Sequence, residues 1–201
     1  MLELIKIFMM EKSAKSKVDT MGAVGWVEVI VKDRDGHIKY RFPETTEETR
    51  SKNEHDCPFT SFPAKMVDFY WRKNIIVNTG IAAIIRLMFA QLTETKFGYL
   101  AIGSDSTLES PTDTALGSEL ARKPASITQI TTTIEGDTAR LEAEFSSADG
   151  LSGTGTIAET GIFNAASGGI MLARKTFPPI VLNFDLGDSI LIRYFVQMLR
   201  A

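Results

Sequence analysis

The feature that most constrains the fold is a succession of short strand-like segments in the second half of the chain. Each segment is rich in β-branched and aromatic residues, and turn residues separate it from the next. The six segments are Ile127–Ile134, Ala139–Ser146, Gly155–Phe163, Ile170–Phe177, Ile180–Phe184 and Ser189–Leu199, with the main breaks at Glu135–Asp137, Ala166–Gly169, Pro178–Pro179 and Leu186–Asp188. Strands at this spacing predict a mainly β protein folded as an antiparallel, jelly-roll-like β-sandwich.

One segment has helical periodicity instead. Between Thr79 and Leu92, apolar residues recur at the spacing of one helix face, and Asn78 or Thr79 is suited to cap its start. Apolar residues also occupy most of the circumference, which predicts a helix packed between the sheet and another layer, in this chain or in another subunit. We expect a short strand at Asn74–Asn78 before this helix and a further helical turn within Thr112–Leu120.

The N-terminal third has a different character. Gly22–Phe42 reads as a β-hairpin turning at Asp35–Gly36, and Pro43–Asp56 is an acidic, threonine-rich stretch that predicts a solvated loop. Cys57–Lys73 carries two prolines and five aromatic residues and is too apolar to stay free of a packing surface. The sequence therefore predicts two parts, an N-terminal arm over 1–73 and a helix-plus-sandwich domain over 74–201, which we expect to fold without the arm. Because a two-stranded hairpin is marginal alone, we expect the hairpin of the arm to add to a sheet, either of its own sandwich or of a neighbouring subunit.

Composition narrows the class of protein. The chain has 201 residues, of which 44% are hydrophobic, and its net charge is −3, so we expect a normal core and no nucleic-acid surface. No apolar run approaches the roughly 20 residues of a membrane span. Cys57 is the only cysteine, which rules out an internal disulfide and favours assembly in a reducing compartment.

The sequence is poor in groups that carry chemistry. Its two histidines, His37 and His55, lie in polar turns or loops, and no second pair accompanies His55 and Cys57 at zinc-like spacing. Asp33–Gly36 resembles the opening of a calcium loop, but Ile38 stands where that loop requires glycine, and a hairpin turn explains the same residues. We therefore predict no metal, no cofactor and no catalytic residue.

Two rival functions remain open at this level. A glycan hydrolase would use Glu142 or Glu159, although Glu142 and Glu144 alternate with Leu141, Ala143 and Phe145 and so favour a solvated strand face. A carbohydrate- or receptor-binding module of a phage fibre would need exposed aromatic residues in the loops after Ser104 and Gly150. Those loops contain none.

Four segments, in order, resemble a family of structural proteins from tailed-bacteriophage particles. The most distinctive are Phe97–Arg122, which includes IAIGSDS and TDTALGSELAR, and Ile157–Arg174, which includes ETGIFNAA and GIMLAR. The resemblance begins at Asn74–Gly80 and ends at Gly187–Val196, so it covers somewhat over half of the chain. The glutamate, glycine and phenylalanine at Glu159, Gly161 and Phe163 are also similar to a turn of tail-fibre attachment domains.

This resemblance implies a non-enzymatic virion component, assembled in the host cytoplasm and placed on the capsid surface or in the neck, tail or fibre apparatus. Its implied partners are copies of itself, most simply in a trimer, and other virion proteins such as major capsid or tail proteins. Large aromatic residues are typical interface anchors. The interface candidates are Trp26, Phe59, Phe62, Phe69, Tyr70 and Trp71.

Overall fold

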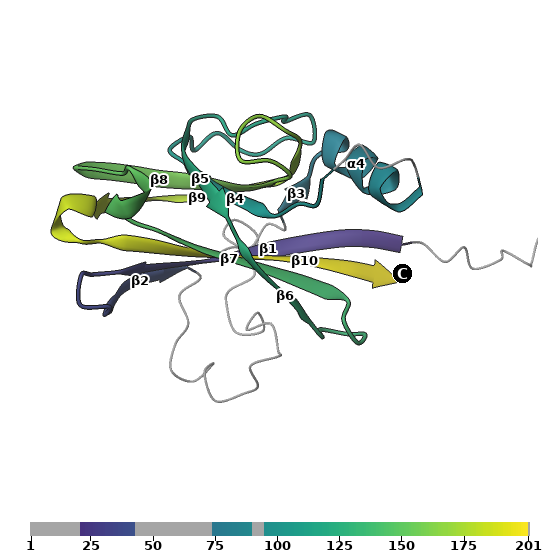
Figure 1. The fold of residues 1–201 in the computed structure, drawn as a ribbon, viewed down its shortest axis with the longest axis horizontal. Coiled ribbons are helices and arrows are strands. Elements are labelled where there is room, and N and C mark those ends of the chain that lie inside the picture. Colours follow the sequence, from purple (N-terminus) through teal and green to yellow (C-terminus); the bar gives the residue numbers. More distant parts are fainter. Residues whose placement is uncertain (1–20, 43–73, 90–94, 201) are drawn as a thin grey trace, which may run out of the picture.

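The computed structural model describes residues 21–42, 74–89 and 95–200. They form two five-stranded antiparallel sheets packed face to face (Figure 1). Sheet A has the order β2-β1-β10-β7-β6, and sheet B has the order β3-β9-β8-β4-β5. The prediction of an antiparallel β-sandwich with one helix is confirmed. The strands of sheet A are β1 (Met21–Lys32), β2 (Ile38–Phe42), β6 (Ser126–Ile130), β7 (Thr138–Phe145) and β10 (Ser189–Arg200), and those of sheet B are β3 (Ile75–Ile76), β4 (Tyr99–Gly103), β5 (Glu119–Pro124), β8 (Thr154–Phe163) and β9 (Met171–Asn183).

Alternate side chains of both sheets fill the space between them. The side chains that enter this core are Val27, Val29 and Val31 from β1 and Leu141, Ala143 and Phe145 from β7, as the two-residue period of the sequence requires. The largest core side chains from other strands include Leu100, Ile102, Ile157, Ile162, Leu182, Ile190, Ile192 and Tyr194. β5 and β6 are separated by Ala125 alone, and there the chain passes from sheet B to sheet A.

The predicted N-terminal hairpin is built into the sandwich. β1 pairs with β10 along all of Met21–Lys32, and β2 extends the sheet from the other side of β1. A two-stranded hairpin alone is marginal in water, and this one is stabilised by adding its apolar face to sheet A. The described part of the predicted arm is thus continuous with the sandwich, while residues 1–20 and 43–73 lie outside the described residues.

Two predicted strands are in fact one. β9 runs without interruption through Pro178–Pro179, so the predicted break between Ile170–Phe177 and Ile180–Phe184 is wrong. The register with β8 shifts at this point, where Ile157 faces Ile180 and Glu159 faces Thr176. Proline has no amide hydrogen to donate and is tolerated at such an irregularity, particularly near the edge of a sheet.

The strand predicted as Ile127–Ile134 ends four residues early, at Ile130, because a turn follows it. The Asp137 carboxylate accepts hydrogen bonds from the backbone amides of Thr132, Thr133 and Ile134. These bonds close a compact turn, so the strand β6 stops at Ile130.

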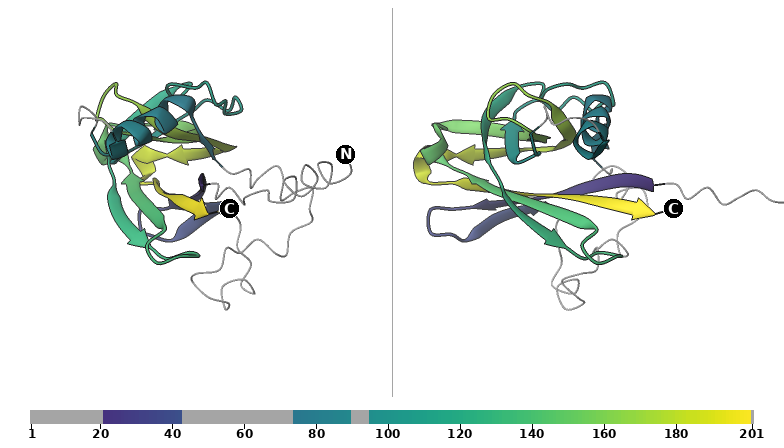
Figure 2. Two further views of the ribbon diagram at one scale, coloured as in Figure 1. Left: turned by 90° about the vertical axis from the view of Figure 1, so that its right-hand side faces the viewer. Right: turned by 45° about the vertical axis from the view of Figure 1, so that its right-hand side comes forward.

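The helix α4 (Asn78–Phe89) covers one end of sheet B (Figure 2). Its start lies close to β9, because a Cβ atom at Gly80 would be 2.5 Å from the carbonyl oxygen of Leu172. Ile84 packs against the core, whereas Ile81, Ile85 and Met88 are 52%, 53% and 54% exposed. Within the described part of this one chain, α4 therefore has an open apolar face, and its cover by another subunit stays a prediction.

Thr112–Leu120 contains no helical turn, contrary to the prediction. A turn closed by a hydrogen bond from the amide of Asp113 to the carbonyl of Ser110 leads through irregular backbone to β5. Within the described residues, no helix has the length and apolar character needed to cross a bilayer.

Candidate functional site

The two most distinctive segments of the family resemblance, Phe97–Arg122 and Ile157–Arg174, meet on the outer face of sheet B, the face turned away from sheet A. Residues 104–118, between β4 and β5, form a loop over this face, which we call the 104–118 loop (Figure 1). Its Leu116 is buried in a small apolar cluster with Ala101, Phe163 and Met171. These apolar contacts hold one point of the loop against sheet B. Ion pairs and hydrogen bonds of charged side chains hold the rest of it.

Arg174 of β9 is the centre of the larger charged cluster. Its side chain is 4% exposed, and each nitrogen of its guanidinium contacts a different carboxylate. Nε lies 2.9 Å from Glu159, and the two terminal nitrogens lie 2.9 Å from Asp113 and Asp105. One arginine thereby joins β8 and β9 to two separate points of the 104–118 loop.

Glu159 of β8 is the most deeply buried carboxylate of this cluster, with no exposed surface. Besides Arg174, it accepts hydrogen bonds from the backbone amides of Ser118 at 2.7 Å, Gly117 at 3.0 Å and Asp105 at 3.3 Å. A buried charge is tolerated only when it is paired and hydrogen-bonded, and Glu159 meets both conditions.

Two glycines allow this close approach. A Cβ atom at Gly103 would collide with the carboxylate of Glu159, and one at Gly117 would collide with that of Asp105. The glycines of the IAIGSDS and TALGSE segments are therefore explained by packing against charged groups.

A second buried ion pair attaches the same loop to the edge of sheet B. Glu109 accepts hydrogen bonds from the Lys175 amine at 2.9 Å and the Thr176 hydroxyl at 2.5 Å, and its side chain is 4% exposed. Its burial alone would raise the pKa of Glu109, but the bond from Thr176 and the charge of Lys175 outweigh that effect, and the pKa is lowered.

Arg122 of β5 is the centre of a smaller cluster around the turn that joins β8 to β9. Its guanidinium pairs with Glu119, lies over the ring of Phe163 at 3.5 Å and donates hydrogen bonds to the carbonyls of Ala165 and Gly168. Asn164 closes the same turn by accepting a hydrogen bond from the amide of Ile170 at 2.7 Å. The two arginines that end the SELAR and MLAR segments thus perform the same structural task.

In the larger cluster, the charged groups stabilise one another's ionised forms. Burial alone would lower the pKa of Arg174, but its hydrogen bonds to Asp113 and Glu159 raise it above the ordinary value. Hydrogen bonds from the backbone and hydroxyl of Thr107 lower the pKa of Asp105, and Arg174 acts in the same direction. These groups therefore remain ionised and paired with one another. Such an arrangement can hold a loop in place but is poorly suited to exchanging protons with a substrate.

The residues considered for hydrolysis are separated. Glu159 lies in the buried cluster on sheet B, while Glu142 lies on the outer face of sheet A, where its carboxylate is 2.6 Å from Arg193. The predicted alternation on β7 is confirmed, with Leu141, Ala143 and Phe145 in the core.

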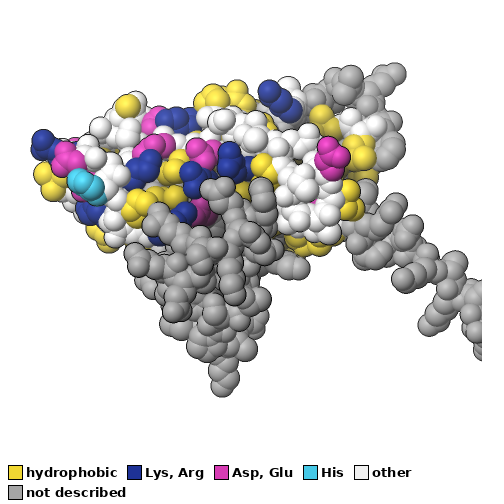
Figure 3. Space-filling model, turned by 90° about the horizontal axis from the view of Figure 1, so that it is seen from below, with side chains coloured by type: hydrophobic (Ala, Val, Ile, Leu, Met, Phe, Trp, Pro, Cys, Tyr) yellow, Lys and Arg dark blue, Asp and Glu magenta, His cyan; other side chains and the backbone are white. Residues whose placement is uncertain are grey.

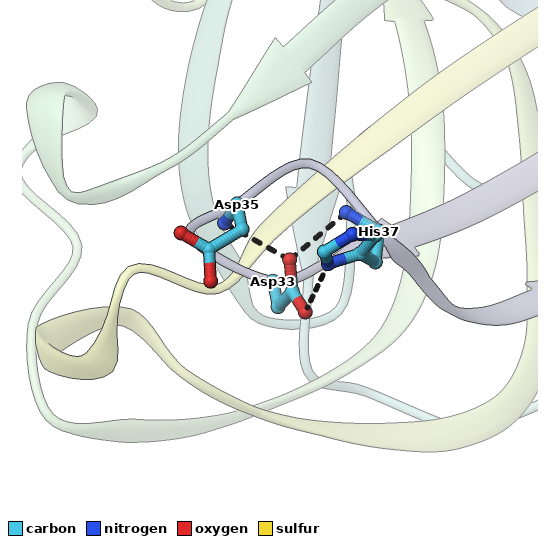
Figure 4. Close-up of side chains that lie close together, drawn as sticks. All are labelled: Asp33, Asp35 and His37. Carbon is cyan, nitrogen blue, oxygen red and sulfur yellow. Dashed lines mark hydrogen bonds and ion pairs between the residues drawn. The ribbon is translucent and has the colours of Figure 1, made fainter.

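The hairpin turn brings Asp33, Asp35 and His37 together, with one ligand atom of each within 4.8 Å of the others (Figure 4). One oxygen of Asp33 accepts hydrogen bonds from the amides of Asp35 and His37, both at 2.9 Å, and the other lies 3.3 Å from the His37 ring. This geometry closes the turn, as the sequence predicted, and His55 and Cys57 lie outside the described residues.

Of the six interface candidates, Trp26 alone falls within the described residues. Its ring stacks on Phe195 of β10, with centroids 5.1 Å apart and planes 7° from parallel. Phe59, Phe62, Phe69, Tyr70 and Trp71 lie outside the described residues.

Sequence reasoning identified the segments of the site but missed their ion pairs. A usable signal was present, since Glu159 lies in a strand whose other residues are apolar or small, and Arg174 with Lys175 interrupts the mostly apolar strand β9. A charged residue in such a strand implies a buried partner, although it does not say which one. No family model, curated protein or solved structure gives a significant match to this chain.

Proposed function

We propose that this chain is a non-enzymatic structural component of a tailed-phage particle that assembles as a homo-oligomer, most simply a trimer. The proposal rests on the resemblance of four segments to structural proteins of such particles. One observation supports it above the others: the charged residues of the two most distinctive segments, Phe97–Arg122 and Ile157–Arg174, pair with one another or with Lys175 and hold the 104–118 loop and the β8–β9 turn on sheet B. These charged residues therefore hold the surface in one conformation.

A fixed surface is what a virion component needs. Such a protein must present the same contacts in every copy and perform no turnover. Buried charges are expensive to desolvate, so they favour the one loop geometry in which every partner is in place. The five-stranded sheets beneath the loops supply a rigid base for that geometry.

The open face of α4 is the described surface best suited to meet a neighbouring protein in this role. Ile81, Ile85 and Met88 lie at intervals of four and three residues and are each more than half exposed. Ala82, which lies beside Ile81 and Ile85 on this side of the helix, is also uncharged. Other copies or another virion protein, such as a major capsid or tail protein, would cover it.

The direct test is to look for the protein in particles. Tailed particles released by cells that carry the gene would be purified, analysed by mass spectrometry and labelled with antibodies to the protein. The proposal expects the protein at a stoichiometry above one per particle, with label at a constant location. Particles that form normally and lack the protein would refute it.

Two solution measurements complement this test. Light scattering at micromolar concentration is expected to give the mass of an oligomer, and a strict monomer would argue against self-assembly. A panel of glycans is expected to remain uncleaved. Cleavage that is lost in Glu142→Gln would instead support the hydrolase alternative.

A further inference from the structure

The strand β6, at one edge of sheet A, lacks the features that usually protect an edge strand. Its sequence, Ser126–Ile130, contains no charged residue and no proline, and the four residues after it are uncharged as well. Four of its five residues are exposed, and among the described residues β6 pairs with β7 alone. An edge of this kind is a template for pairing with another strand.

The strands at the other three edges of the two sheets are protected. β2 carries Lys39 and Arg41, and β3 is only two residues long. β5 carries three charged residues and ends at Pro124. Charges, proline and short length all disfavour pairing with a foreign strand. Of the four terminal strands that the structure describes, β6 is therefore the one that is open to such pairing.

The described ion pairs on the outer face of sheet A form a row that stops before β6. Glu28 on β1 lies 3.1 Å from Arg193 on β10, and Arg193 lies 2.6 Å from Glu142 on β7. Arg41 on β2 contacts Glu28 at the other end of this row. Figure 3 shows basic and acidic side chains interspersed over this side of the molecule. A strand that approaches β6 meets an edge strand without charge.

The hydrogen-bond pattern of sheet A shows which backbone groups of β6 point away from the sheet. The amide of Met198 donates to the carbonyl of Asp137, so these residues form a hydrogen-bonded pair of the β7–β10 ladder. Such pairs alternate along a regular antiparallel ladder, so odd-numbered residues of β7 bond to β10 and even-numbered residues bond to β6. The even-numbered residues of β6 lie opposite the latter. The amides and carbonyls of Ile127 and Gln129 are therefore directed outward.

This pattern is self-complementary. When β6 of a second copy runs antiparallel about a two-fold axis at Thr128, Ile127 of each copy faces Gln129 of the other. Both are hydrogen-bonded pairs, each with two bonds, so every outward amide and carbonyl of these two residues finds a partner. Thr128 lies opposite Arg140, on the outer face of sheet A, and meets its own counterpart in the centre as a non-hydrogen-bonded pair.

We propose that β6 is the docking edge for β6 of a second copy of this chain, which joins the five-stranded sheet A of each copy into one continuous antiparallel sheet. Two identical uncharged strands approach without like-charge repulsion, and a two-fold contact satisfies both edges at once. The inference does not depend on the phage assignment. The contact joins copies in pairs, so it differs from the contact that closes a trimer.

The central position allows a test by charge. Thr128 is exposed, so Thr128→Lys and Thr128→Glu are expected to leave the single chain folded, which circular dichroism checks. Each variant alone places two like charges directly opposite one another across the axis. In sedimentation velocity we expect each variant alone to have half the mass of the wild type, and an equal mixture of the two to recover the wild-type mass.

The matched control is Thr154→Lys, which adds the same charge at an exposed position of β8 and is expected to keep the wild-type mass. The proposal is overturned if either variant at position 128 keeps the wild-type mass, or if the mixture does not recover it. A wild-type trimer that both variants leave intact would overturn this inference and leave the proposed homo-oligomer standing. A dimer that both variants dissociate, in a protein absent from particles, would refute the phage proposal alone.

A second experiment tests the register of the contact. Residues of a non-hydrogen-bonded pair have Cα atoms about 4.5 Å apart, which is within reach of a disulfide. With the only native cysteine removed by Cys57→Ser, Thr128→Cys is expected to give a disulfide-linked dimer on mild oxidation. Ser126→Cys is the control, because Ser126 lies opposite Ile130 of the other copy and stays unlinked. No dimer from Thr128→Cys, or equal amounts from both variants, would overturn the proposal.

Discussion

The outer faces of the two sheets use arginine–carboxylate pairs in opposite ways. On sheet B, Arg174 is 4% exposed and joins three carboxylates beneath a loop of its own chain. On sheet A, Arg193 is 30% exposed and joins two carboxylates on the strands beside it. The same chemical groups therefore determine a loop conformation on one face and contribute to a strand surface on the other. Burial accounts for the difference in stabilisation. Solvent screens an exposed ion pair, whereas a buried charge that loses its partner has no water to solvate it.

The largest expected effect comes from removing the first two strands of sheet A. A chain that begins at residue 43 loses Val27, Val29 and Val31 from the core and uncovers one edge of β10. Burial of each such side chain contributes about 1.5–3 kcal/mol, and a domain has only about 5–15 kcal/mol of stability in total. We expect no cooperative unfolding transition by circular dichroism, the opposite of what the sequence predicted for the sandwich without its N-terminal part.

A chain that begins at Met21 is the control for this deletion, since it retains every described strand. It is expected to unfold cooperatively. A truncated chain starting at residue 43 that folds as well as this control would show that sheet A does not depend on its N-terminal strands.

The next effect tests the buried cluster on sheet B. Arg174→Ala leaves Glu159 without its cation in a fully buried position, and breaking a buried pair from one side costs about 3–5 kcal/mol. The measurement is the free energy of unfolding in urea. A loss below about 1 kcal/mol, the range of exposed pairs, would contradict the contrast drawn between the two faces.

A smaller effect and its pH dependence are expected for Glu109. Glu109→Gln leaves the buried Lys175 with a weaker partner, and we expect a loss of about 1–3 kcal/mol at neutral pH. The folded state lowers the pKa of Glu109 below its ordinary value of 4.5, so its stabilising contribution is present above that value and is lost as the pH falls through the lowered pKa. Wild type and variant should converge in acid, and a constant difference from neutral pH to pH 3 would refute this account.

The smallest effect is expected on sheet A. Arg193→Ala removes an arginine that is 30% exposed from the row of charges, and exposed pairs contribute about 0–1 kcal/mol. Urea unfolding of this variant beside Arg174→Ala gives the comparison in a single experiment. Equal losses in the two variants would show that burial does not separate the two faces.

Local patterns were sufficient to predict most elements. The alternation on β7, the hairpin turn at Asp35–Gly36 and the helical period after Asn78 all appear in the structure as the sequence indicated. Each depends on residues close together in the chain, because the periods of strands and helices and the conformations of turns are local properties.

Other features were decided only when distant segments met. Pro178–Pro179 reads as a break, yet an irregular register with β8 lets the strand continue. The sequence indicates that the hairpin must join a sheet but not which one, and the structure pairs it with β10 from the other end of the chain. Arg174 finds Asp105 and Asp113 some sixty to seventy residues away. The sequence by itself determined which segments would be strands, helix or turns, and the tertiary structure decided which strands would be neighbours and which charges would be buried together. Pairing and burial depend on contacts between distant parts of the chain, and no local period encodes them.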